Sequence, residues 1–127
     1  MNHFLLVAAG GAIGAALRHG VGVLTLRHLS SSWPWATFTV NILGSFAMGL
    51  LIGWLALRAE GAGQSTRLFL ATGLLGGFTT FSAFSLETMS LLRTGETVKA
   101  LAYVTFSVVL GVAALGLGLW LTRRGLA

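Results

Sequence analysis

The sequence predicts an all-α integral membrane protein with four transmembrane helices. The composition is 55% hydrophobic and only 9% charged, with a mean hydropathy of +0.86, whereas a soluble domain carries about 25% charged residues. Four apolar windows are each near or above the roughly 20 residues that cross a bilayer. They lie at about 4–26, 36–57, 68–92 and 100–122. Because the stretches between them are short, we expect residues 1–127 to form a single four-span domain in the cell membrane.

The charge and cysteine content exclude several other classes. The chain has no cysteine, so it has no disulfide and no thiolate metal site. Its net charge is +5, but the basic residues are scattered one or two per segment end and form no patch for phosphate binding. We therefore expect no nucleic-acid partner. An enzymatic activity and an organic cofactor are not expected either.

The first span, 4–26, holds an arginine well inside its apolar run. Residues 4–17 are too few to cross a bilayer, so the span continues past Arg18. A guanidinium near the bilayer centre costs about 2.5–3.5 kcal/mol on insertion scales. Arg18 therefore reaches back to the interface, caps helix carbonyls, or sets a positive potential at a vestibule. Gly10 and Gly14, four residues apart, favour close packing of this helix on a neighbour.

The second span, 36–57, carries a polar stripe. Pro34 suits the start of a helix. Thr37, Asn41 and Ser45 then follow at four-residue intervals, which places them on one helix face. Leaving the Asn41 amide unpaired in hydrocarbon costs several kcal/mol. Two interpretations of Asn41 stay open: a structural hydrogen bond between helices, or a donor that faces an ion pathway.

The third span, 68–92, has a composition that a simple membrane anchor does not need. Residues 72–87 combine paired glycines, hydroxyl groups, three phenylalanines at three-residue spacing and a carboxylate. Non-helical backbone at membrane depth is tolerated only where protein buries it or where it lines a cavity. We expect the third helix to be broken near its middle, at residues 76–80. Carbonyls at such a break suit a cation, and free N–H groups suit an anion.

The half-helix after this break carries the side chains that could contact an ion. Phe81 and Phe84 lie on one face, and their ring edges are the positive part of the aromatic quadrupole. These rings either pack in a core or approach a small anion, with Ser82 as an added hydroxyl donor. Glu87 is expected at the interface, paired with Arg93, or at a pore mouth as an acid or proton-handling group.

The fourth span and the charge balance complete the layout. Tyr103 and Ser107 are again four residues apart, and Tyr103 is either an interfacial belt residue or an inward-facing one. A Lys/Arg imbalance normally sets orientation, and here there is almost none. The chain either inserts both ways and pairs with an inverted copy, or one or two residues fix a single orientation. One side carries Arg58, Arg67, Arg123 and Arg124; the other carries Arg27, Arg93 and Lys99, with Arg18 close to it.

Three of these stretches together resemble the signatures of the Fluc (CrcB) fluoride channel family. They are residues 10–18 (GGAIGAALR), 38–46 (FTVNILGSF) and 76–85 (GGFTTFSAFS), in the family's order and on its spans. The motifs cover about a quarter of the chain, and the four-span layout covers all of it. One departure is Ala83, where the family often has a hydroxyl residue.

The resemblance implies an antiparallel, dual-topology homodimer that passively exports fluoride and gives fluoride resistance. It also implies a structural sodium ion at the dimer interface, held by the backbone carbonyls of Gly76 and Thr79. The expected fluoride pathway comprises Asn41, Phe81, Phe84, Ser82, Tyr103, Ser107 and Thr37, with Arg18 and Glu87 as charges at a vestibule or pore mouth.

An alternative function is a small dual-topology, proton-coupled exporter of drugs or cations. Such a carrier shares the four short spans, but it needs a membrane-buried carboxylate early in the chain. The first span has no acid and carries only Arg18. This difference favours the fluoride channel.

Overall fold

The computed structural model describes residues 2–29, 32–57 and 63–126, where all regular structure is helical. Arg58, which entered the charge balance, lies outside these residues, as does the side chain of Arg124. Four helical runs are long and apolar enough to cross a membrane, which confirms the predicted class: His3–His28, Trp35–Ala56, Gly63–Arg93 and Thr97–Arg123. The elements are α1 (His3–His28), α2 (Trp35–Ala56), α3 (Gly63–Thr66), η2 (Arg67–Leu75), α4 (Gly76–Phe78), α5 (Phe81–Arg93) and α6 (Thr97–Leu126).

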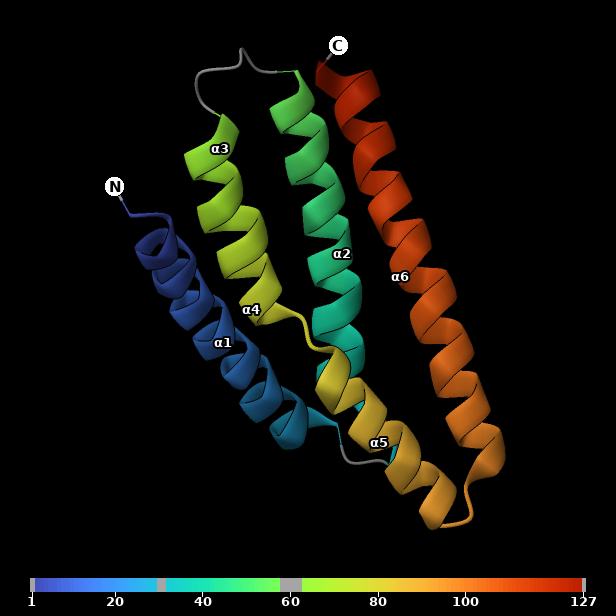
Figure 1. Ribbon diagram of the computed structural model, residues 1–127. Helices are drawn as coiled ribbons and strands as arrows, with labels where there is room; N and C mark the ends of the chain where they lie inside the picture. The colour runs from blue at the N-terminus through green and yellow to red at the C-terminus, as the bar shows by residue number, and fades with distance from the viewer. Residues whose placement is uncertain (1, 30–31, 58–62, 127) are drawn as a thin grey trace.

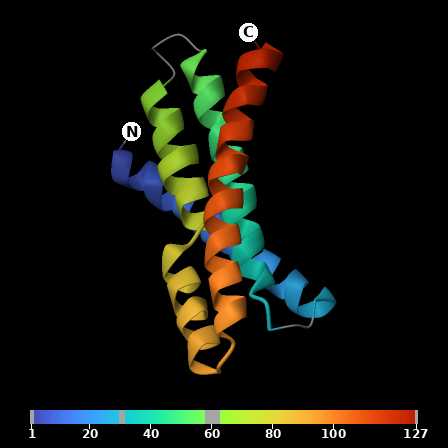
Figure 2. The same ribbon diagram turned by 90° about the vertical axis from the view of Figure 1, so that its right-hand side faces the viewer.

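The four runs alternate in direction, so both chain termini lie at the same end of the molecule (Figure 1). The run from α3 through α5 descends between α1 and α2, and α6 returns beside α2. The view at right angles shows α1 tilted across the other helices (Figure 2). The most extensive packing pairs α2 with α6 and α1 with η2.

Glycine lets α1 approach η2 and α4 at backbone distance. A Cβ atom added at Gly14 would lie 2.0 Å from the carbonyl oxygen of Leu74, and one at Gly10 would lie 2.3 Å from that of Phe69. The small pair predicted from the sequence as a packing motif therefore faces a neighbouring backbone. In lipid, such close contact supplies the van der Waals attraction that holds helices together.

The segment η2 is a π-helix, which the sequence did not predict. Its wide turn is visible at its end, where the Gly76 N–H donates to the carbonyl of Ala71, five residues back. π-Helical turns are rare and occur mostly as short insertions near functional sites. Here the segment presents Gly73 to α1, where an added Cβ would lie 2.9 Å from the carbonyl oxygen of Val7.

A small core joins α5 and α6 near the loop between them. Leu91, Ala100 and Tyr103 are buried together, and Phe38 and Phe84 pack against them. Tyr103 therefore faces inward, which decides against the interfacial belt for this residue. Its ring lies 5.1 Å from that of Phe84, centroid to centroid. Packing around the Tyr103 ring therefore fixes how α5 and α6 are each rotated about their own axes.

Candidate functional site

The site is centred on two residues with extended backbone. Helix α4 ends at Phe78 and α5 begins at Phe81, while Thr79 (φ −89°, ψ 159°) and Thr80 (φ −151°, ψ 124°) are extended. The Thr80 side chain accepts a hydrogen bond from the Ala83 N–H, 3.2 Å away, and so caps the start of α5. Threonine at this position is a common N-cap, because its oxygen satisfies a backbone donor that has no helical partner.

Asn41 of α2 holds this extended segment in place. Its Nδ2 donates to the Thr80 carbonyl at 3.0 Å, and its Oδ1 accepts from the Thr80 N–H at 2.8 Å. One side-chain amide therefore replaces the two backbone partners that a continuous helix would have provided. Of the two interpretations left open for Asn41, the hydrogen bond between helices is present. The same residue also lines a pocket of about 300 Å³ with Ser45, Thr79 and Phe81.

Two carbonyls beside this segment lose the donors that a helix would give them. The Thr80 N–H, which would bond to Gly76 in a continuous helix, donates to Asn41. The Ala83 N–H, four residues after Thr79, donates to the Thr80 side chain. The carbonyls of Gly76 and Thr79 are thereby left to find other partners. Gly76 is exposed in this chain, so its backbone faces outward from the four-helix unit.

Arg18 reaches the same region from α1. Its Nε donates to the Gly77 carbonyl at 3.1 Å, in a half-buried setting. This carbonyl also lies just before the extended residues. Of the roles weighed for Arg18, capping of a helix carbonyl is therefore observed. The guanidinium also lines a pocket of about 390 Å³ with His19, Thr37 and Thr80, so its charge faces a cavity.

Glu87 accepts hydrogen bonds from two neighbouring helices. The Thr37 hydroxyl of α2 donates to Oε2 at 2.9 Å, and the Tyr103 hydroxyl of α6 donates to Oε1, also at 2.9 Å. Thr37 and Tyr103 are both buried, and Glu87 itself is half-buried. The arrangement orients two hydroxyl donors around one carboxylate inside an apolar protein, where such hydrogen bonds are strong.

Aromatic rings connect this carboxylate to the extended segment. Phe84 lies between Tyr103 and Phe81, with ring centroids 5.1 Å and 5.7 Å away respectively. Phe84 is half-buried, whereas Phe81 is 77% exposed. A row of three rings therefore runs from the buried phenol to an open face of the molecule.

The remaining predicted residues are only partly drawn into this arrangement. Ser107, one helical turn beyond Tyr103, has a buried hydroxyl with no hydrogen-bond partner among the described residues. Ser82 is exposed, and its hydroxyl lies 3.4 Å from that of Thr80. Sequence reasoning missed the central role of Thr80. The signal that could have identified it is a threonine at the start of the half-helix, where its hydroxyl can accept a hydrogen bond from the N–H of Ala83, three residues later.

Comparison with known proteins identifies the family. The family described as "CrcB-like protein, Camphor Resistance (CrcB)" matches residues 5–119. This chain belongs to the CrcB family. Full-length relatives agree: a protein of Hyphomonas neptunium named "Fluoride-specific ion channel FluC" is 69% identical over 124 residues, with 98% of each chain covered.

Two further CrcB relatives carry the same name. The protein from Phenylobacterium zucineum is 55% identical over 125 residues, with 98% of each chain covered. The protein from Caulobacter vibrioides is 48% identical over 124 residues, again with 98% of each chain covered. With four helices able to cross a bilayer, this CrcB protein is a multi-pass protein of the cell membrane.

Proposed function

We propose that this protein is a fluoride-selective channel that lets fluoride leave the cell passively and so gives fluoride resistance. Its relatives over the full chain length are named as fluoride-specific channels. The observation that supports the proposal best is the row of rings from Phe81 to Tyr103, set beside amide and hydroxyl donors. The proposal includes no chemical reaction, so the protein is not an enzyme in this scheme.

Selectivity would come from replacing the water around a small anion. Fluoride needs several strong donors at once, because its hydration is costly to remove. We propose that Asn41, Ser82 and Ser107 supply them in turn. Thr37 and Tyr103, whose hydroxyl hydrogens are directed to Glu87, would join them by turning from Glu87 to the ion. The edges of Phe81 and Phe84 approach the ion between these donors, since a ring edge is electropositive and excludes water. A larger anion such as chloride would not fit so narrow a path.

The pathway is proposed to be completed by a second, inverted copy of the chain. The pocket lined by Asn41, Ser45 and Thr79 is open on one side in the single chain, and Phe81 lies exposed at its edge. A polar groove with extended backbone does not face lipid. The nearly balanced Lys/Arg distribution favours insertion in both orientations. An antiparallel homodimer covers the groove of each copy.

A structural sodium ion is proposed at the centre of that dimer. The carbonyls of Gly76 and Thr79 fit the role, because the N–H groups that would pair with them in a helix donate elsewhere. Hard cations prefer oxygen ligands, and carbonyls at the end of an interrupted membrane helix supply them. The ion would supply positive charge that links the two copies, with no part in chemistry. In this proposal the extended segment is a true break of the third membrane helix.

Liposomes that contain the purified protein and a fluoride gradient test the function. We expect rapid fluoride efflux when a potassium ionophore carries the compensating charge, and little chloride efflux from matched chloride-loaded vesicles. Comparable chloride and fluoride fluxes would contradict selectivity. A drug-exporter function would instead require proton-coupled uptake of an organic cation, which the same vesicles can measure. An accessibility label at the C terminus should react on both sides of the membrane if the dimer is antiparallel.

A further inference from the structure

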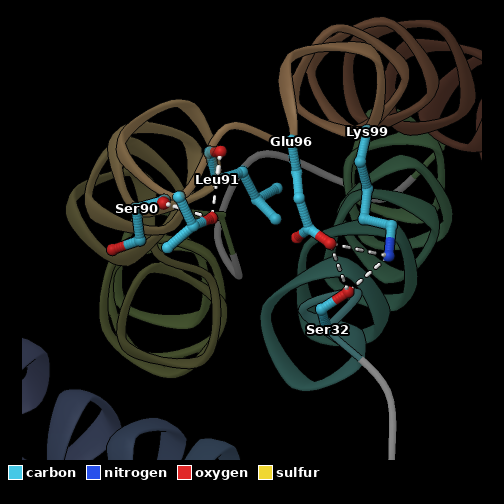
Figure 3. Close-up of polar contacts among 6 residues, drawn as sticks. Ser32, Ser90, Leu91, Glu96 and Lys99 are labelled. Atoms are coloured by element: carbon cyan, nitrogen blue, oxygen red, sulfur yellow. Dashed lines mark hydrogen bonds and ion pairs between the residues drawn. The ribbon is translucent and has the colours of Figure 1, made fainter.

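A second polar cluster lies where α5 turns into α6, away from the extended segment. Lys99 at the start of α6 donates to the hydroxyl of Ser32, and its Nζ lies 3.6 Å from Oε1 of Glu96. The Ser32 hydroxyl in turn donates to that same oxygen at 3.4 Å. Figure 3 shows Glu96 and Lys99 converging on Ser32 from across the gap between α6 and the loop that precedes α2. The three side chains tie these two segments together.

The tight turn between α5 and α6 fixes the position of Glu96. Gly95 has a φ of +83°, which a residue with a side chain rarely adopts. The Glu96 N–H donates to the Leu91 carbonyl at 2.9 Å, and the Glu96 carbonyl accepts from Ala100 at 2.9 Å. The backbone on both sides of Glu96 is therefore held by hydrogen bonds, and the carboxylate is presented at a defined place.

A pocket leads from this cluster to the carboxylate of the proposed pathway. It has a volume of about 410 Å³, and its lining includes Ser32 and Glu96 of this cluster together with Ser90, Thr94 and Glu87. A neighbouring pocket of about 320 Å³ also contains Ser32 and Glu87 in its lining. Ser32 therefore shares two pockets with Glu87, the residue that orients the Thr37 and Tyr103 hydroxyls.

The charge of this opening is unusual for an anion pathway. The sequence contains only three acidic residues, and two of them, Glu87 and Glu96, line the same pocket. Two carboxylates facing one cavity repel an anion. The single lysine of the sequence, Lys99, lies beside Glu96 and offers three donors on a flexible stem. Its side chain is 36% exposed, so it also contacts solvent.

We propose that Ser32, Glu96 and Lys99 form an electrostatic gate at the mouth of the Glu87 pocket. Lys99 offsets the charge of Glu96 and draws fluoride toward the opening, while Glu96 and Ser32 hold the Lys99 ammonium group at the rim and moderate its charge. This inference rests on the proposed fluoride conduction. It adds the residues that set the rate of ion entry and exit at this end of the pathway.

Fluoride efflux from liposomes at low fluoride concentration, where entry limits the rate, tests the gate. At low ionic strength we expect Lys99→Gln to reduce efflux about two- to fivefold and Glu96→Gln to raise it by a similar factor. The double variant should lie near the wild type. In high salt the differences should shrink, because screening weakens exposed charges. Arg93→Gln is the matched control, since Arg93 is an exposed basic residue at the end of α5 that does not line the pocket.

The outcomes separate the gate from its alternatives. Equal losses in Lys99→Gln and Arg93→Gln would mean that general surface charge sets the rate, and would overturn the gate. Reduced efflux in both Glu96→Gln and Lys99→Gln would indicate a structural latch and overturn it as well. If Lys99→Gln does not purify as a folded protein, Lys99→Arg with Glu96→Gln still decides, since only the second should raise efflux. Absence of fluoride efflux in the wild type would instead contradict the proposed function itself.

Discussion

The two halves of the third helical run are positioned by different physical means. The first half, α3 through α4, lies against α1 through glycine, with backbone meeting backbone. The second half, α5, is held by side chains: Asn41 at its start, and Glu87 with Thr37 and Tyr103 further along. Close backbone packing has no room for a larger residue, whereas a hydrogen-bond network can lose one member and keep the fold. Substitutions in the two halves should therefore differ in kind.

The largest effect on stability is expected in the glycine-packed half. In Gly14→Ala, the new Cβ would lie 2.0 Å from the Leu74 carbonyl oxygen, with backbone on both sides of the contact. Because neither backbone can shift without moving a whole helix, we expect a loss of at least about 2 kcal/mol of stability. Thermal unfolding in detergent, with the yield of monodisperse protein, measures this loss.

The matched control is Gly20→Ala on the same helix, where an added Cβ meets nothing within 4 Å. It should leave the unfolding midpoint unchanged or raise it slightly, since alanine favours a helix. Equal midpoints for the two variants would mean that the packing of α1 does not require glycine at position 14.

The largest effect on fluoride flux should come from Asn41→Asp, at the junction of the two halves. Aspartate keeps an acceptor for the Thr80 N–H but loses the donor to the Thr80 carbonyl, and adds a negative charge beside the pocket. We expect fluoride efflux to fall by about 100-fold, or roughly 3 kcal/mol in the barrier, while the protein stays folded. Asn2→Asp, which keeps the cap of α1 through its remaining oxygen, controls for added charge. Equal efflux from both variants would remove Asn41 from the pathway.

The same contrast explains what could be predicted from the sequence. Span positions follow from runs of apolar residues. That Asn41 needs a partner follows from the cost of an unpaired amide in hydrocarbon, but the sequence left open whether that partner is another helix or an ion. The partners of Glu87 did not follow: Arg93 was considered, yet the carboxylate bonds to Thr37 and Tyr103. Such pairs depend on the rotation of each helix about its axis, which packing sets. The π-helical turns of η2 escaped prediction because no local pattern separates them from an α-helix.

A smaller effect should separate the two phenylalanines of α5. Phe84 packs between Phe81 and Tyr103, whereas Phe81 is 77% exposed in the single chain. Both Phe81→Ile and Phe84→Ile should reduce fluoride efflux about tenfold or more, since each removes a ring edge from the path. Only Phe84→Ile should also lower stability, by about 1 kcal/mol for the lost ring contacts. Phe106→Ile, at an exposed position on α6, should change neither quantity. A full fluoride flux in both α5 variants would show that the rings only pack.

The smallest effect on flux, and the most discriminating test, concerns two hydroxyls one turn apart on α6. Tyr103→Phe removes a donor from Glu87 and should cost about 1–2 kcal/mol of stability. Ser107→Ala removes a buried hydroxyl that has no partner among the described residues. It should therefore leave stability unchanged or raise it by up to about 1 kcal/mol. If the Ser107 hydroxyl serves the ion, its removal should still slow fluoride efflux a few-fold. Unchanged or higher stability together with slower fluoride efflux in Ser107→Ala would mark Ser107 as a group retained for conduction. An unchanged flux in Ser107→Ala would remove it from the pathway.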